Sequence, residues 1–194
     1  MKNKIAAVVL ASGKSERMQE NKLLMEFNGM PICEHVIKTL SSLSVDVIVV
    51  TCYKEVLEIA KKYNAIVVEN NESHLGQSRS VVLGVKKALD YDAIIFVPAD
   101  QPLVTEETFN GLINKFLSCN KIVVSSYNRE RGIPTLFPKR FYSQLLKIEG
   151  DMGGREVIVN NYNDIERFEV KDVRERFDID SPVDYVKLKN DILI

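Results

Sequence analysis

The sequence predicts an α/β fold in which a single doubly wound domain, residues 1–194, surrounds a mostly parallel β-sheet. Short runs rich in valine and isoleucine alternate along the chain with segments of helical periodicity. The apolar runs are nearly continuous, which is typical of parallel strands covered by helices on both faces. Glycine, proline or asparagine marks most of the junctions between these segments.

Five apolar runs predict strands, and four helical patterns lie between them. The predicted strands are Ile5–Ala11, Val45–Cys52, Ala65–Glu69, Ala93–Val97 and Lys121–Ser126, and the predicted helices cover 31–43, 53–63, 77–90 and 105–118. In open α/β sheets, ligands bind at the carboxyl ends of the strands. We therefore expect the loops after Leu10, Glu69, Val97 and Ser126 to meet at one edge of the sheet.

The second half of the chain has a different pattern. Residues 132–138 predict a short strand or extended segment, 139–148 a helix, and Arg155 the start of another helix. The alternation over Asp164–Val170 predicts an edge strand. Asp180–Leu193 predicts a closing helix, since its Asp-Ser-Pro start places proline in the first turn.

Composition and charge exclude several classes of protein. The chain is 45% hydrophobic and 27% charged, as is ordinary for a soluble globular protein. Its formal net charge of -1 gives no general attraction to nucleic acid or to an anionic membrane, so local charge must hold any phosphate ligand. No apolar run approaches the roughly 18 residues of a membrane span. Three widely spaced cysteines and the lack of a signal peptide pattern predict a cytoplasmic protein without disulfides or zinc.

The segment after the first predicted strand carries the strongest functional signal. Residues 10–25 are Leu-Ala-Ser-Gly-Lys-Ser-Glu-Arg-Met-Gln-Glu-Asn-Lys-Leu-Leu-Met. Gly13 allows a ligand to approach the backbone, and successive N–H groups in such a turn form an anion-binding concavity. Lys14, Arg17 and Lys22 add positive charge close to that turn. This pattern predicts a loop that binds a triphosphate.

Two phosphate-binding motifs compete for this loop. Gly13-Lys14-Ser15 matches the end of a P-loop, G-x-x-x-x-G-K-[ST]. A P-loop needs glycine five positions before Gly13, where the chain has Val8 within the strand, so this motif is disfavoured. A basic, solvated loop that binds nothing is a further alternative.

The signature L-A-x-G-x-S-x-R-M-x-x-x-K, in contrast, resembles that of the MobA-like nucleotidyltransferase family. It is matched at Leu10, Ala11, Gly13, Ser15, Arg17, Met18 and Lys22. The family usually has glycine directly after Arg-Met, where this chain has Gln19. The resemblance implies a Rossmann-like nucleotidyltransferase fold of the nucleotide-diphospho-sugar transferase type. It further implies that residues 10–13, including Ser12, together with Ser15, bind the nucleotide, and that Arg17 and Lys22 contact its phosphates.

Two acidic motifs predict a metal site. Asp100, in Pro-Ala-Asp-Gln-Pro, follows the fourth predicted strand, and Mg²⁺ prefers one or two carboxylates with waters and phosphate oxygens. The motif resembles the family's metal-binding aspartate, although a turn or N-cap aspartate and a Walker B carboxylate have the same pattern. Asp178-Ile-Asp180-Ser-Pro182 resembles the family's closing motif, D-x-D-[ST]-P. Asp180 is therefore either a second carboxylate near the metal or the N-cap of the last helix.

The segment from Asn70 to Gly84 resembles the one with which cytidylyltransferases of this fold contact base and ribose. Gly76 and the Ser-Val-x-x-Gly spacing carry the resemblance, which implies that Ser80 hydrogen-bonds a pyrimidine edge. Such a contact discriminates well, because the wrong base leaves a buried polar group unpaired. The alternative is that the serines of this segment only cap the helix that follows.

Two glycine-containing segments resemble the acceptor side of the molybdenum cofactor cytidylyltransferase branch. They are Gly132-Ile-Pro134 and Glu149-Gly-Asp-Met-Gly-Gly154. The resemblance implies that Gly132, Gly153 and Gly154 lie close to a flat pterin and that Arg155 meets its phosphate. That branch often has histidine after the first glycine, where this chain has Ile133.

Together these resemblances imply transfer of CMP from CTP to a phosphorylated acceptor, molybdopterin, with Mg²⁺ or Mn²⁺ and release of pyrophosphate. A molybdenum hydroxylase is the expected recipient of the product. Ala11-Ser12, in place of the Ala/Gly-Gly typical of guanylyl-transferring relatives, favours CTP over GTP. The alternatives are guanylyl or sugar-phosphate transfer on the same fold, a non-catalytic cofactor carrier or chaperone, and a P-loop-like kinase.

Overall fold

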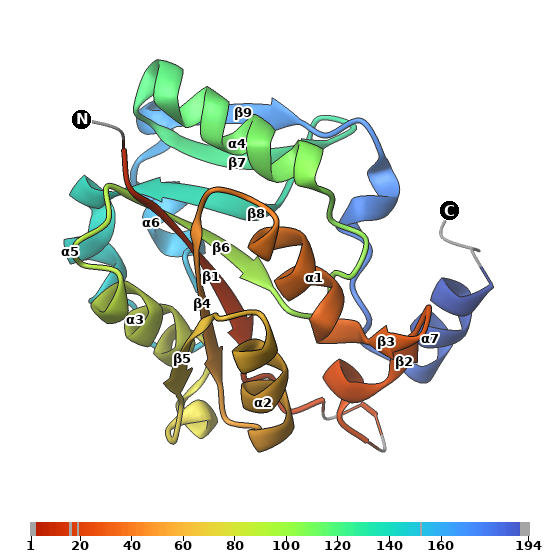
Figure 1. The fold of residues 1–194 in the computed structure, drawn as a ribbon. Coiled ribbons are helices and arrows are strands. Elements are labelled where there is room, and N and C mark those ends of the chain that lie inside the picture. Colours follow the sequence, from red (N-terminus) through yellow and green to blue (C-terminus); the bar gives the residue numbers. More distant parts are fainter. Residues whose placement is uncertain (1–2, 16, 19, 152, 191–194) are drawn as a thin grey trace.

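The computed structural model describes residues 3–15, 17–18, 20–151 and 153–190. A seven-stranded sheet with the order β5-β4-β1-β6-β8-β7-β9 forms its centre (Figure 1). The strands of this sheet are β1 (Ile5–Ala11), β4 (Asp46–Thr51), β5 (Ile66–Glu69), β6 (Ala93–Pro98), β7 (Ile122–Tyr127), β8 (Glu130–Pro138) and β9 (Ile165–Glu169). Each of the five strands predicted from apolar runs is present, and the edge strand predicted near 164–170 is β9.

Helices connect most of these strands. The α-helices are α1 (Ile32–Ser41), α2 (Lys54–Lys62), α3 (Gln77–Lys87), α4 (Glu106–Cys119), α5 (Tyr142–Leu145), α6 (Arg155–Asn160) and α7 (Pro182–Lys189). The helix predicted over 139–148 is shorter than expected: a 3-10 turn over Lys139–Phe141 precedes the four residues of α5. No helix in the described part of the chain is both long and apolar enough to span a membrane.

The predicted mostly parallel sheet is confirmed, with one exception. Strand β1 pairs in parallel with β4 and β6, whereas β8 is antiparallel to both β6 and β7. The reason is the two-residue turn between β7 and β8, in which Asn128 and Arg129 both have positive φ. Such a turn reverses the chain, whereas a parallel neighbour requires a long crossover.

Two apolar cores, one on each face of the sheet, confirm the doubly wound arrangement. On one face, alternate residues of β1, including Ala7 and Val9, pack with α1, α2 and α4. On the other face, Ala6 and Val8 pack with α3, α5 and α6. Helices therefore cover both sides of the sheet, and its carboxyl edge remains available for a ligand.

A third, smaller cluster brings the C-terminal segment to the first loop. Ile32, Ile179 and Leu188 are buried together and pack against the hairpin formed by β2 (Glu26–Phe27) and β3 (Met30–Pro31). Figure 1 shows α7 beside this hairpin. The turn of the hairpin, Asn28-Gly29, has positive φ at both residues, as a type I′ turn requires.

Helix α3 packs closely against β1 at Gly84, so a substitution of Gly84 tests the contact between these two elements. A Cβ added at Gly84 would lie 2.5 Å from Cγ1 of Val8. Glycine-to-alanine normally stabilises a helix interior, but here we expect Gly84→Ala to lower the free energy of unfolding by about 1–3 kcal/mol through overpacking. Denaturant unfolding measures the change.

The same measurement in a Val8→Ala background is the control, because shortening Val8 leaves room for the added methyl group. The cost of Gly84→Ala should be smaller in that background. An equal cost in both backgrounds would contradict the close contact between α3 and β1.

Candidate active site

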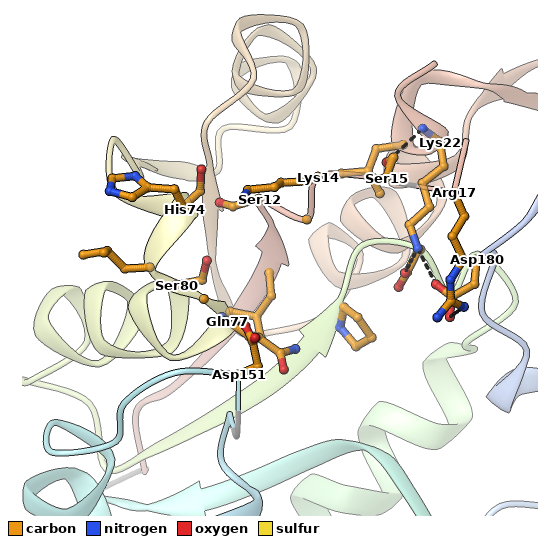
Figure 2. Close-up of a pocket in the computed structure, with 18 residues that line it drawn as sticks. Ser12, Lys14, Ser15, Arg17, Lys22, His74, Gln77, Ser80, Asp151 and Asp180 are labelled. Atoms are coloured by element: carbon orange, nitrogen blue, oxygen red, sulfur yellow. Dashed lines mark hydrogen bonds and ion pairs between the residues drawn. The ribbon is translucent and has the colours of Figure 1, made fainter. Parts of the chain in front are cut away.

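A cleft of about 620 Å³ lies at the carboxyl edge of the parallel strands. Its lining residues are Leu10, Ser12, Gly13, Lys14, Ser15, Arg17, Lys22, Leu23, Ser73, His74, Leu75, Gly76, Gln77, Ser80, Pro98, Asp100, Asp151 and Asp180. The loops after β1, β5 and β6 meet here as expected, but the loop after β7 contributes none of these residues. Figure 2 shows Ser12, His74 and Ser80 at one end and Lys22, Arg17 and Asp180 at the other.

The first loop is fastened to the end of β4. Ser12 Oγ donates to the Val50 carbonyl at 3.2 Å, and Thr51 Oγ1 donates to the Ala11 carbonyl at 3.0 Å. The Tyr53 hydroxyl donates to the carbonyl of the next loop residue, Gly13, at 2.7 Å. Ala11, between Leu10 and Ser12, is fully buried and is not among the residues that line the cleft. The sequence analysis did not identify the roles of Thr51 and Tyr53, since both depend on contacts with a distant segment.

Ser15 organises the turn that presents Lys22. Its φ is 52°, and its carbonyl accepts a hydrogen bond from Met18 N at 2.8 Å. Its hydroxyl accepts one from Lys22 N at 3.3 Å. The serine of the L-A-x-G-x-S motif thus fixes the backbone from which the Lys22 side chain extends.

The ammonium group of Lys22 joins two carboxylates. Lys22 Nζ lies 2.6 Å from Asp100 Oδ2 and 2.8 Å from Asp180 Oδ1, and the lysine side chain is only 10% exposed (Figure 2). Burial by itself lowers the pKa of Lys22, but the charges and hydrogen bonds of Asp100 and Asp180 outweigh it and raise that pKa above its usual value. Arg17 lies at 3.9 Å from the other oxygen of Asp180. Lys22 therefore carries a stable positive charge inside the cleft.

The second oxygen of Asp100 is suited to a cation. Asp100 Oδ1 is buried and has no hydrogen-bond partner within the described ranges. A buried carboxylate oxygen without a protein partner is costly, and a bound cation would satisfy it. No group of three or more metal-binding side chains is found among the described residues, and Asp100 and Asp180 are the two carboxylates that contact Lys22 in the cleft. Two carboxylates fit Mg²⁺ or Mn²⁺, whose remaining positions waters and phosphate oxygens fill.

The structure excludes Asp180 as the N-cap of the last helix. That position belongs to Ser181, whose hydroxyl accepts from Asp184 N, while the Asp180 side chain turns to Lys22. Asp178 belongs to the same motif. Its burial raises the pKa of its carboxyl group, and the negative charges of Asp100 and Asp180 raise that pKa further. The sequence analysis assigned Asp178 no role.

The end of the cleft opposite Lys22 is formed where the 149–154 loop packs on the start of α3. Ser78 N donates to the Gly150 carbonyl at 3.0 Å, and Gln77 N donates to Asp151 Oδ1 at 3.2 Å. Gly76, with φ of 99°, allows this approach, because an added Cβ would lie 2.7 Å from Asp151 Oδ1. Ser80 is nearly buried and accepts a hydrogen bond from Asn70. Neither Asp151 nor Asn70 was identified as a site residue from the sequence.

The residues expected on the acceptor side do not line the cleft. Gly132 packs against Tyr127, and Gly153 lies near the Gln77 side chain. Gly154 packs against the Phe137 ring, and Arg155 is the exposed first residue of α6. Among the described residues of the 149–154 loop, Asp151 alone lines the cleft.

Comparison with known protein families identifies the chain. The family model described as "MobA-like NTP transferase domain" matches residues 7–165. The chain belongs to this family. It is therefore a nucleotidyltransferase, and an NTP is the substrate expected for the family. The match includes the first loop, Asp100 and Asp151, and it ends before Asp180.

Two relatives illustrate the range of the family. The chain is 29% identical over 194 aligned residues to the purine catabolism protein PucB of Bacillus subtilis, covering 93% of this chain and 94% of PucB. It is 33% identical over 122 aligned residues to a probable molybdenum cofactor guanylyltransferase of Pyrococcus horikoshii. That second alignment covers 61% of this chain and 60% of the relative.

Solved structures share the fold at low sequence identity. A nucleotidyl transferase from Methanothermobacter thermautotroptrophicus superimposes with a TM-score of 0.84 at 24% identity, covering 99% of both chains. Rv0371c from Mycobacterium tuberculosis in complex with manganese superimposes with a TM-score of 0.80 at 20% identity. The superposition covers 96% of this chain and 98% of Rv0371c. CMP:2-keto-3-deoxy-manno-octonic acid synthetase complexed with CTP superimposes with a TM-score of 0.79 at 14% identity, and the superposition covers 97% of this chain and 98% of the synthetase. These likenesses confirm the predicted nucleotide-diphospho-sugar transferase type of fold.

Substitution of Gly76 tests the packing of the 149–154 loop on α3. We expect Gly76→Ala to destabilise the protein by about 2 kcal/mol or more, because φ of 99° with ψ of 175° is a conformation that essentially only glycine adopts and because overpacking costs about 1 kcal/mol or more. Gly150→Ala is the matched control, since Gly150 also has positive φ, 65°, but an added Cβ there would meet no atom within 4 Å. Denaturant unfolding of both variants measures the difference, and equal costs would contradict the close packing.

Proposed function

We propose that this protein transfers CMP from CTP to a phosphorylated acceptor, molybdopterin, in a reaction that requires Mg²⁺ and releases pyrophosphate. The observation that carries the proposal is the ion pair of Lys22 with Asp100, 2.6 Å long and enclosed in a cleft beside the Gly13 loop. In such a site the buried cation can neutralise charge on a bound triphosphate, and the carboxylate beside it can bind a metal ion. Gly13 supports a ligand here, since an added Cβ would meet no protein atom within 4 Å.

The proposed reaction is an in-line substitution at the α-phosphorus of the nucleotide. An oxygen of the acceptor phosphate forms the new P–O bond, and the bond to the β-phosphate oxygen breaks, so that its electron pair leaves with pyrophosphate. The acceptor oxygen is already anionic, and no general base is needed. The backbone at 11–13 holds the nucleotide, while Arg17 and Lys22 neutralise charge on its phosphates. Positioning and electrostatic stabilisation then account for catalysis.

Asp100 and Asp180 would hold the metal ion. When bound, Mg²⁺ or Mn²⁺ neutralises the charge that develops around the α-phosphate. The unpartnered Asp100 Oδ1 supports this assignment, as does the manganese complex of Rv0371c. Because Lys22 bridges both carboxylates, a metal held by the same two carboxylates would compete with its ammonium group, which the nucleotide phosphates could accept instead.

CTP and molybdopterin are the proposed substrates on separate grounds. Ser80 at the base end of the cleft, with Ala11-Ser12 in the first loop, favours cytosine. Guanylyl transfer is the second candidate, because the Pyrococcus horikoshii relative is named as a guanylyltransferase. The same name supports molybdopterin as the acceptor.

The experiment that tests the proposal incubates the purified protein with molybdopterin, one of CTP or GTP, and Mg²⁺ or Mn²⁺. Pyrophosphate and the dinucleotide product are quantified. CTP-dependent release of pyrophosphate that requires both acceptor and metal is the expected result. Preference for GTP would establish guanylyl transfer instead, and no pyrophosphate from either nucleotide would overturn the proposal.

Replacement of the two central charges should remove most of the activity. We expect Lys22→Ala and Asp100→Ala each to lower kcat by about a hundredfold or more, the scale for loss of one preorganised electrostatic group. Lys61→Ala, an exposed lysine on α2 that pairs with Glu58, is the control and should keep wild-type turnover. Near-normal turnover by a folded Lys22 or Asp100 variant would contradict the mechanism.

Lys22 should also suppress metal binding before the nucleotide arrives. Its ammonium group neutralises both carboxylates, so we expect Lys22→Met to tighten the binding of Mn²⁺ to the nucleotide-free protein by about tenfold or more. Isothermal titration calorimetry measures the affinity. Lys61→Met makes the same change of net charge at a remote site and should leave it unchanged. If both variants bind Mn²⁺ alike, Lys22 does not compete with the metal.

A further inference from the structure

The hydrogen bonds of Asn70 determine the orientation of its side-chain amide. Asn70 follows β5 and is fully buried. Its Oδ1 lies 3.1 Å from Glu72 N, and its Nδ2 lies 2.9 Å from Ser80 Oγ. Because a backbone N–H can only donate, the amide atom facing Glu72 must be the oxygen. The atom facing Ser80 is therefore the NH₂ group.

This orientation determines what the Ser80 hydroxyl can do. An NH₂ group only donates, so Ser80 Oγ accepts from Asn70 and keeps its own proton for another partner. Across the described residues, Ser80 donates to no protein acceptor. Ser80 lines the cleft and is 4% exposed. Its proton is therefore available to a bound ligand.

We propose that Asn70 is a positioning residue that makes Ser80 a hydrogen-bond donor toward the nucleotide base. The inference rests on the proposed function, in which the base lies at the Ser80 end of the cleft. A donor at this point selects a base edge that offers a carbonyl oxygen or an unprotonated ring nitrogen. Cytosine offers two adjacent acceptors, O2 and N3, whereas the corresponding edge of guanine offers two adjacent donors, N1–H and N2–H₂, and a single acceptor, O6. Asn70 thus selects a cytosine edge over a guanine edge through Ser80.

The substitution Asn70→Asp reverses the polarity of this arrangement. A carboxylate still accepts from Glu72 N, so the turn keeps its hydrogen bond. The second carboxylate oxygen replaces a donor with an acceptor and takes the Ser80 proton. Ser80 then offers only lone pairs to the base, which opposes cytosine and suits a guanine N–H group.

The experiment measures kcat and KM for CTP and GTP in wild type, Asn70→Asp, Ser80→Ala and the double variant. We expect Asn70→Asp to lower the ratio of kcat/KM for CTP to that for GTP by about tenfold, through KM with kcat nearly unchanged. In the Ser80→Ala background, Asn70→Asp should change this ratio little, because its effect passes through the hydroxyl. Asn71→Asp, which adds the same charge at the next, exposed position, is the matched control and should leave the ratio unchanged.

Two results would overturn the inference. One is an equal change of the ratio in Asn70→Asp and Asn71→Asp, which would assign the effect to charge alone. The other is an effect of Asn70→Asp that is as large without the Ser80 hydroxyl as with it, which would assign it to damage of the turn. The proposed function fails separately, if the wild-type enzyme uses neither nucleotide or prefers GTP. With GTP as substrate, the same four variants still measure whether Asn70 acts through Ser80.

Discussion

The arrangement of the cleft depends on the ion pairs that the ammonium group of Lys22 forms. It is nearly buried, so it requires charged partners, and it finds them in Asp100 at the end of β6 and in Asp180. Asp180 lies 158 residues further along the chain than Lys22. Removing one partner of a buried ion pair commonly costs about 3–5 kcal/mol, because the other charge remains uncompensated. The two ion pairs therefore join the first loop, the central sheet and the C-terminal segment in one geometry.

The same interaction gives the cleft two chemically different ends. At the Lys22 end, cations and carboxylates lie close together, which suits phosphates and a divalent metal. At the Ser80 end, hydroxyl and amide groups lie against apolar strands, with the carboxylate of Asp151 beside Gln77, which suits a base that is recognised by hydrogen bonds. The rigid sheet holds the two ends apart, and loops alone would not fix that separation. A nucleotide fits this polarity with its triphosphate toward Lys22 and its base toward Ser80.

Much of this arrangement was predictable because the signals are local. Apolar runs such as Ile5–Ala11 predict the strands, and the spacing from Gly13 to Lys22 predicts a loop that lines the cleft. The role of Asp180 was undecided in the sequence, since a helix cap and a metal ligand require the same residue type. The position of Ser181 as the N-cap excludes the cap, and the metal role of Asp180 stays a proposal. The Asn28-Gly29 turn carried a local signal that the sequence analysis did not use. The contacts of Asn70, Thr51 and Asp151 are formed between separate segments, and no local pattern indicates them.

The most direct test of the account is a crystal structure of the protein with a non-hydrolysable CTP analogue and Mn²⁺, with anomalous scattering used to locate the metal. The account predicts a manganese peak between the carboxylates of Asp100 and Asp180. It also predicts that Lys22 Nζ has moved from those carboxylates to the phosphates of the analogue. A Lys22 that still bridges Asp100 and Asp180, with manganese bound elsewhere or absent beside an ordered nucleotide, would contradict it.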